Sequence, residues 1–200
     1  MNYSLMGIPD EEFLRGDIPM TKQEIRILAL AKAQIGPEDI VIDVGAGTGS
    51  LSVEAARLAV RGRVYAIERE PEGASLIRAN AQKFAAANLE VLEGLAPDAM
   101  QGLPAANAVF VGGSGGHLWP ILERIDELLK PGGRIVIMAV TIETLHEALN
   151  WAEHNPPYTV SACGIQVNRL RRAGSSHMFQ ALNQVYIIQC KKSETLQEGL

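Results

Sequence analysis

The sequence is poor in cysteine and in excess basic charge. Its 200 residues include two cysteines, Cys163 and Cys190, which lie far apart and in no metal-like spacing. This argues against a disulfide scaffold or a zinc site and fits a reducing cytosol, so we expect a cytoplasmic protein without a metal. The formal net charge is −5. A global basic field for nucleic acid is therefore absent, and we expect no nucleic-acid partner.

Long apolar runs and a secretory N-terminus are also missing. No stretch of about 18 apolar residues predicts a membrane span, and the start, MNYSLMGIPDEEF, has no apolar core of a signal peptide. We therefore expect no membrane partner. The chain is 47% hydrophobic and 20% charged, which suits one domain with a substantial core.

Apolar runs and helical patterns alternate along most of the chain. Residues 1–20, broken by glycine and proline, predict an irregular N-terminal arm. Thr21 is then predicted as the N-cap of a helix over 22–35, with Glu24 completing a capping box. Strands are predicted over 40–45, 63–69, 89–94, 107–113 and 134–140, and helices over 50–60, 71–87, 119–129 and 141–154. Repeated strand–helix–strand units predict an α/β fold with a mostly parallel sheet and helices on both faces.

The C-terminal part predicts two more strands, over 158–167 and 183–190, which brings the sheet to seven. Residues 168–182 join them without a helical pattern, and we expect the two strands to pair antiparallel at the edge. The Pro-Gly-Gly of 131–133 predicts a turn before strand 134–140. One domain over 21–192 then accounts for the regular elements, between the arm and a tail over 193–200.

A glycine-rich loop joins the first predicted strand to its helix. The sequence VIDVGAGTGS places Gly45, Gly47 and Gly49 there. Glycines let the backbone approach a ligand closely, and the helix N-terminus favours an anionic group. Glu68 ends the second strand about 20 residues later, where an acid can accept from ribose hydroxyls. This combination favours a nucleoside site over a turn that merely connects strand and helix.

Two nucleoside ligands compete for this loop. A dinucleotide fingerprint is Gly-x-Gly-x-x-Gly, whereas here the spacing is Gly-x-Gly-x-Gly and position 50 is serine. The pattern of one acid before such a loop and another on the second strand resembles that of the class I S-adenosylmethionine methyltransferases, which have a Rossmann-like fold. The resemblance implies S-adenosylmethionine as co-substrate. Asp43, inside the strand, is interpreted either as a structural carboxylate or as a neighbour of the methionine amino group.

Longer motifs resemble one branch of these enzymes, the CbiT family. They are the segments GIPDEEFLRGDIPMTKQEIR, DVGAGTGS, YAIERE, LEGLAPDAM and VFVGGSGGHL. The resemblance runs from about residue 7 to residue 185 and extends to the C-terminal half of CobL-type precorrin-6Y methyltransferases. It implies methylation of carbon 15 of a precorrin-type tetrapyrrole, decarboxylation of a ring-C acetate, a role in cobalamin biosynthesis and a homotetramer. One departure is Gln184, where the family pattern has proline.

The resemblance also assigns residues to the co-substrate. Thr21 matches a threonine that reaches the co-substrate from the N-terminal segment. Glu68 matches the acid that binds the ribose. Ala96 matches the position beside the adenine, and Leu95 precedes it in the sequence. The predicted cofactor-binding set is Thr21, Gly45, Ala46, Gly47, Thr48, Gly49, Glu68, Leu95 and Ala96.

The glycine run after the fourth predicted strand is interpreted as cleared space for a broad planar ring. Missing Cβ atoms let the ring approach, and bare N–H groups can bind its carboxylates. Acetate and propionate groups also call for cations. The predicted substrate-binding set is Gly112, Gly113, Ser114, Gly115, Arg169 and Arg172, with a flexible or solvated loop as the alternative. His117 is the one candidate for acid–base chemistry, although a helix-start histidine without a chemical role is favoured.

Two other functions fit the same pattern. One is another class I methyltransferase, acting on protein L-isoaspartate or on RNA. An RNA enzyme would usually carry a basic strip and often an Asp/Asn-Pro-Pro-aromatic tetrad after the fourth strand, where this chain has glycines. The other is a non-catalytic subunit that binds the cofactor. The sequence leaves open whether the tetrapyrrole holds cobalt and which residues act in decarboxylation.

Overall fold

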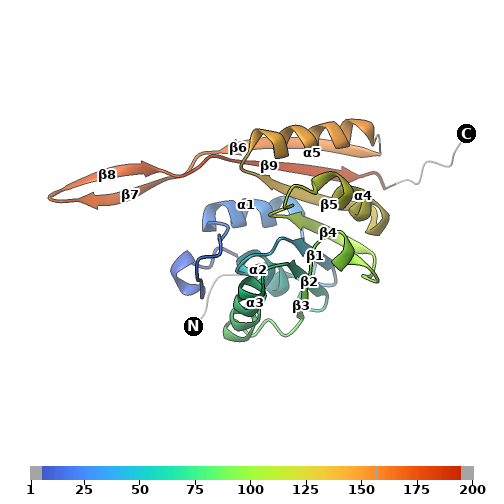
Figure 1. The fold of residues 1–200 in the computed structure, drawn as a ribbon, viewed down its shortest axis with the longest axis horizontal. Coiled ribbons are helices and arrows are strands. Elements are labelled where there is room, and N and C mark those ends of the chain that lie inside the picture. The colour runs from blue at the N-terminus through green and yellow to red at the C-terminus, as the bar shows by residue number, and fades with distance from the viewer. Residues whose placement is uncertain (1–5, 156, 195–200) are drawn as a thin grey trace, which may run out of the picture.

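Helices and strands alternate along most of the chain in the computed structural model, which describes residues 6–155 and 157–194 (Figure 1). The predicted tail over 193–200 lies mostly outside these residues, as does the start of the arm. The helices are α1 (Gln23–Ala33), α2 (Ser50–Leu58), α3 (Pro71–Lys83), α4 (Leu118–Leu128) and α5 (Ile142–His154), with short 3-10 turns η1 (Asp10–Glu12) and η2 (Asp98–Met100). The strands are β1 (Ile40–Val44), β2 (Arg63–Glu68), β3 (Leu89–Glu93), β4 (Ala106–Val111), β5 (Leu129–Ala139), β6 (Tyr158–Ile165), β7 (Asn168–Ala173), β8 (Ser176–Ala181) and β9 (Val185–Lys192).

Seven strands form one sheet in the order β3-β2-β1-β4-β5-β9-β6. Strands β1 to β5 pair in parallel, whereas β9 is antiparallel to both β5 and β6. The mostly parallel seven-stranded sheet is thus confirmed, and so is the antiparallel pairing of the last two predicted strands. The strand order reverses between β1 and β4, the point at which open α/β sheets place their ligands.

Apolar side chains on alternate faces of the sheet form two cores. On β1, Ile42 and Val44 pack with residues of α4 and α5, while Val41 packs with residues of α1 and α2. Successive strand residues point to opposite faces, so near-continuous apolar strands require helices on both sides. Helices α1, α2 and α3 cover one face, and α4 and α5 cover the other.

The N-terminal arm is part of the domain body. Ile8, Phe13 and Met20 are buried in a small cluster with Val53 of α2, and Phe84 packs against it. The ring centroids of Phe13 and Phe84 are 4.9 Å apart. Burial of these side chains fixes the path of the arm toward the carboxyl ends of the strands.

The start of α1 differs from the prediction. Thr21 is not its N-cap: the helix begins at Gln23, and Lys22 in the cap position makes no side-chain capping bond. The N–H of Gln23 donates instead to Oδ1 of Asp10 at 2.9 Å. A carboxylate from the arm therefore replaces the predicted capping box with Glu24.

Two more segments differ from what the sequence predicted. Residues 131–133, expected as a turn, lie inside β5, where the register against β4 shifts. Residues 168–182, for which no element was predicted, contain the hairpin of β7 and β8. This two-stranded ribbon extends away from the body (Figure 1).

Candidate active site

A cavity of about 750 Å³ opens at the carboxyl ends of the parallel strands. The loops after β1, β2, β3 and β4 supply part of its lining. The arm at 18–22 and the base of the hairpin at 180–183 supply much of the rest. A volume of this size lies within the range of small-molecule sites.

Bare backbone forms the lining after β1. Gly45 has φ +70° and Gly47 has φ +58°, in the left-handed region that favours glycine. A Cβ on Gly45 would overlap the carbonyl oxygen of Gly113, and one on Gly47 would lie 2.8 Å from the carbonyl oxygen of Pro19. The loop therefore packs main chain to main chain against both the glycine run and the arm.

Glu68 presents a fixed carboxylate to this cavity from the end of β2. Its Oε2 accepts the N–H of Gly47 at 2.7 Å, and its Oε1 accepts the N–H of Glu70 at 2.9 Å. The residue is only 7% exposed. An ionised carboxylate has about four lone-pair sites, so acceptor capacity remains for ligand hydroxyls.

Asp43 lies behind the loop and does not line the cavity. Burial raises the pKa of its carboxyl to about 6, with a further rise from the charge of Glu68, although Ser52 donates a hydrogen bond to its Oδ2. This bond ties β1 to the first turn of α2. The geometry agrees with the interpretation of Asp43 as a structural carboxylate.

A buried ion network holds the arm at the cavity. Arg26 is fully buried; its Nε donates to Glu54 at 2.9 Å and its Nη1 to Asp10 at 2.7 Å. The same Nη1 donates to the carbonyl oxygen of Thr21 at 2.6 Å. Oε2 of Glu54 accepts the N–H of Gly7 at 2.6 Å. The network therefore fixes the segment that brings Thr21 to the cavity.

Arg26 and Glu54 were not predicted from the sequence. Both lie on helices, where a charged side chain ordinarily points to solvent. One signal was present: Glu54 is the only acid in the mostly apolar helix segment SLSVEAARLAV.

Most predicted co-substrate residues meet at the cavity. The lining includes Thr21, Gly45, Ala46, Gly47, Glu68, Leu95 and Ala96. Thr48 and Gly49 do not line it, because both are buried and Gly49 packs against Ile77 of α3.

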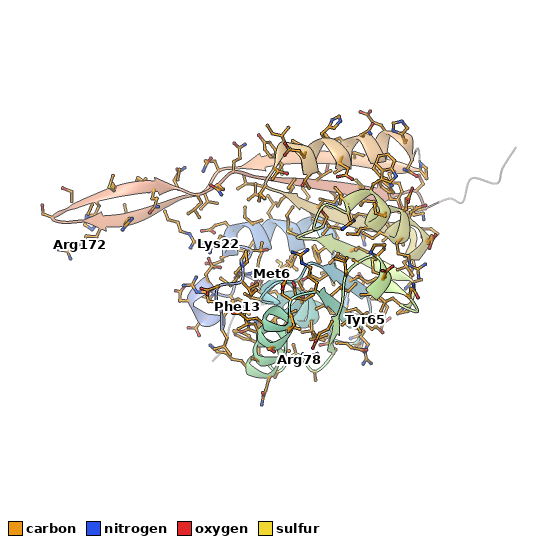
Figure 2. The ribbon with its side chains drawn as sticks, viewed as in Figure 1. Met6, Phe13, Lys22, Tyr65, Arg78 and Arg172 are labelled. Carbon is orange, nitrogen blue, oxygen red and sulfur yellow. The ribbon has the colours of Figure 1, made fainter. Side chains whose placement is uncertain are left out.

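The predicted substrate residues divide into two groups. Gly112, Gly113, Ser114 and Gly115 line the cavity, whereas Arg169, Arg172 and His117 do not. Nη2 of Arg169 bonds to Asp10 and to Glu24, both at 2.8 Å, which ties the hairpin to the arm and to α1. Arg172 lies near the far end of the hairpin (Figure 2), and His117 is exposed at the N-terminal end of α4.

The cavity also has lining residues that no sequence pattern predicted. The hairpin base contributes Gln180, Ala181, Leu182 and Asn183, and Lys22 and Arg69 add positive charge. Within residues 6–155 and 157–194, no cluster of three or more His, Cys, Asp or Glu side chains could hold a metal ion. In that same part of the chain, none of the helices has the length and apolarity needed to cross a membrane.

Comparison with known proteins gives consistent matches. The family described as precorrin methyltransferase domain matches residues 12–192. A curated protein of Salmonella typhimurium, cobalt-precorrin-6B C(15)-methyltransferase (decarboxylating), is 42% identical over 186 residues, or 92% of this chain and 96% of that protein. A curated protein of Pyrobaculum aerophilum, probable cobalt-precorrin-6B C(15)-methyltransferase (decarboxylating), is 41% identical, over 93% of this chain and 96% of that protein.

Solved structures agree with these matches. Precorrin-6Y C5,15-methyltransferase from Geobacter metallireducens superposes with a TM-score of 0.89 at 38% identity, covering 95% of this chain and 100% of that one. An S-adenosylmethionine-dependent O-methyltransferase from Thermotoga maritima, at 19% identity, has a TM-score of 0.71 over 90% of this chain and 68% of that one. The second likeness shows that the fold is that of class I methyltransferases.

Proposed function

Because the chain belongs to the precorrin methyltransferase family, we propose that it methylates carbon 15 of a precorrin-type tetrapyrrole and decarboxylates the ring-C acetate, with S-adenosylmethionine as methyl donor. The observation that carries this function is one cavity in which the glycine loop, Glu68 and the glycine run of 112–115 meet. The chain is a decarboxylating methyltransferase of cobalamin biosynthesis. The alternatives of an isoaspartate or RNA methyltransferase and of a non-catalytic subunit have no comparable support.

The residues around the glycine loop fit S-adenosylmethionine. The bare main chain from Gly45 to Gly47 gives room for the amino-acid part, and the free acceptor sites of Glu68 suit the two ribose hydroxyls. Leu95 and Ala96 offer an apolar edge for adenine. When bound, the co-substrate supplies an electrophilic methyl group and leaves as a neutral thioether. The protein therefore needs no acid for the leaving group, and its residues orient and desolvate the reactants.

The other part of the cavity fits a flat macrocycle. A Cβ added to Gly113 would meet no atom within 4 Å, so the run after β4 leaves open space. Ile18, Val140 and Leu182 supply apolar lining, and Val140 at the end of β5 is 65% exposed. A planar conjugated ring would bury this surface, which stabilises binding. In decarboxylation the electron pair of the breaking C–C bond would pass into the conjugated ring.

A homo-oligomer, which the resemblance gives as a tetramer, is also part of the proposal. Leu170 and Phe179 face each other across the hairpin and are 62% and 70% exposed. An isolated two-stranded hairpin is marginally stable in water, so a second copy covering these side chains would stabilise it. Light scattering of the purified protein should give a tetramer, and Phe179→Ser should shift the mass toward the monomer.

A cytoplasmic location without nucleic-acid or membrane partners completes the proposal. It is supported by the net charge of −5 and by two cysteines that form no disulfide. No metal is proposed for the protein itself.

The experiment is incubation of the purified chain with S-adenosylmethionine and a precorrin-6B-type tetrapyrrole, with and without cobalt. Mass spectrometry should show gain of one methyl group and loss of carbon dioxide. A tetrapyrrole of unchanged mass, from protein that still binds S-adenosylmethionine, would overturn the proposed function.

A further inference from the structure

The cavity contains two cations that neither the sequence motifs nor the comparisons assign. Among the described lining residues, the ionisable side chains are those of Lys22, Glu68, Arg69 and Glu70. Resting on the proposed function, we propose that Lys22 and Arg69 bind the acetate and propionate carboxylates of the tetrapyrrole. They would take the role that was predicted for Arg169 and Arg172.

Lys22 has a charge that the described residues leave unpaired. It is half-buried at the end of α1 nearest the hairpin (Figure 2). In the described part of the chain, no side chain or carbonyl accepts a hydrogen bond or ion pair from its ammonium group. The nearby carboxylates of Asp10 and Glu24 are both bonded to Arg169. An ammonium group that is partly removed from water and lies beside an apolar cavity is well placed to bind a ligand carboxylate.

Arg69 follows Glu68 and lies against the glycine run. A Cβ on Gly115 would be 2.9 Å from Nη1 of Arg69, so the missing side chain at 115 gives the guanidinium its place. Its Nε pairs with Glu70 at 3.1 Å, but both side chains are more than half exposed. Such exposed pairs contribute little, whereas the guanidinium fork matches a carboxylate in a two-bonded arrangement. A substrate carboxylate would therefore compete well with Glu70.

These positions have a chemical consequence for decarboxylation. A cation beside a carboxylate stabilises its negative charge and so opposes the loss of carbon dioxide. Lys22 and Arg69 would therefore hold carboxylates that remain on the ring. The acetate that is lost would lie away from both cations, and the pair would orient the macrocycle accordingly.

The test is the steady-state kinetics of Lys22→Gln, Arg69→Gln and the double variant. Each single variant should raise the tetrapyrrole KM about tenfold, as expected for loss of a charge-assisted hydrogen bond, and the double variant should raise it further. The tetrapyrrole KM of the wild type should rise with salt, and that of the double variant should depend on salt much less. Lys22→Arg should restore most of the affinity, because it restores the charge.

Two matched controls separate this effect from general loss of surface charge. Arg78 on α3 pairs with Glu93 at 2.6 Å at similar exposure, and Lys32 lies on α1; neither lines the cavity. Arg78→Gln and Lys32→Gln should leave the tetrapyrrole KM unchanged. If the wild type turns over and the Lys22 and Arg69 variants keep its KM, this inference fails and the proposed function stands. If the wild type neither binds nor converts the tetrapyrrole, both fail.

Discussion

The cavity has two walls that are built by different means. The first wall, residues 45–47 and Glu68, consists of bare main chain and one carboxylate held by backbone N–H groups. We propose that it binds S-adenosylmethionine and call it the cofactor wall. The second wall, residues 18–22 and 180–183, comes from the arm and the hairpin base. We propose that it faces the tetrapyrrole and call it the substrate wall, although Thr21 on it is also predicted to reach the co-substrate. Buried and half-exposed ion pairs hold the segments behind this wall. A wall of main chain is sensitive to added atoms, whereas a wall held by ion pairs is sensitive to lost charges and to pH.

Loss of the buried cation behind the substrate wall should have the largest effect. Arg26→Met would leave Glu54 buried without its cation and Asp10 with Arg169 alone, at a cost of about 3–5 kcal/mol in the free energy of unfolding. The freed Thr21 segment should also weaken S-adenosylmethionine binding. Denaturant unfolding and calorimetry measure the two effects.

The matched control for this variant is an exposed pair. Arg61 pairs with Glu38 at 3.1 Å with both side chains mostly exposed. Arg61→Met should change stability by less than about 1 kcal/mol. Equal losses for the two variants would show that the buried network does not hold the arm.

An added atom in the cofactor wall should come next. Gly45→Ala combines a left-handed φ with overlap onto the carbonyl oxygen of Gly113, and should lower the free energy of unfolding by about 2–3 kcal/mol. Gly174 in the hairpin turn also has a left-handed φ, but a Cβ there would meet nothing within 4 Å. Gly174→Ala should therefore cost only about 1 kcal/mol. Thermal unfolding compares the two, and a Gly45 variant as mild as the Gly174 variant would argue against close packing of the loop.

Loss of the hairpin's ion pairs should have the smallest effect, and it should depend on pH. Arg169→Met removes the bonds to Asp10 and Glu24, at a cost of about 0.5–1 kcal/mol near neutral pH. Burial alone would raise the pKa of Asp10, but hydrogen bonds from Arg169 and Arg26 hold it below its usual range. The hydrogen bond from Arg169 likewise lowers the pKa of Glu24.

The sign of the pH effect follows from these lowered pKa values. A carboxyl group whose pKa is lowered in the folded state stabilises the protein at pH values above the pKa it has in the unfolded state. This stabilisation is lost as the pH falls through the folded-state pKa. The stability difference between the wild type and Arg169→Met should therefore shrink between about pH 5 and about pH 2. Unfolding at several pH values measures it, and a difference that grows on acidification would contradict the ion-pair account.

The cofactor wall could be predicted from the sequence because its signals are local. β-Branched apolar runs mark the parallel strands, three glycines mark the loop, and Glu68 follows at the spacing of a ribose acid. Each of these depends on neighbours within one strand–helix–strand unit. The sheet and most lining residues on this wall were predicted for the same reason.

The substrate wall depends on contacts that are distant in sequence. Arg169 bonds to Asp10 across 159 positions, and Asp10 replaces the local cap expected from Thr21. Strands β7 and β8 are mostly exposed and have no buried face. Their sequences therefore lack the alternation of apolar and polar residues that predicts a half-buried strand. Arg169 was predicted to bind the substrate, but in the structure its guanidinium pairs with Asp10 of the arm and Glu24 of α1.

The division of the cavity is tested most directly by Gly113→Val, in the glycine run that packs against Gly45. A Cβ at Gly113 would meet no atom within 4 Å, so the larger side chain should enter open space without unfolding the protein. Calorimetry should give an S-adenosylmethionine affinity close to that of the wild type, and mass spectrometry should show no methylation of the tetrapyrrole. Normal methylation, or loss of S-adenosylmethionine binding in a folded variant, would contradict the account.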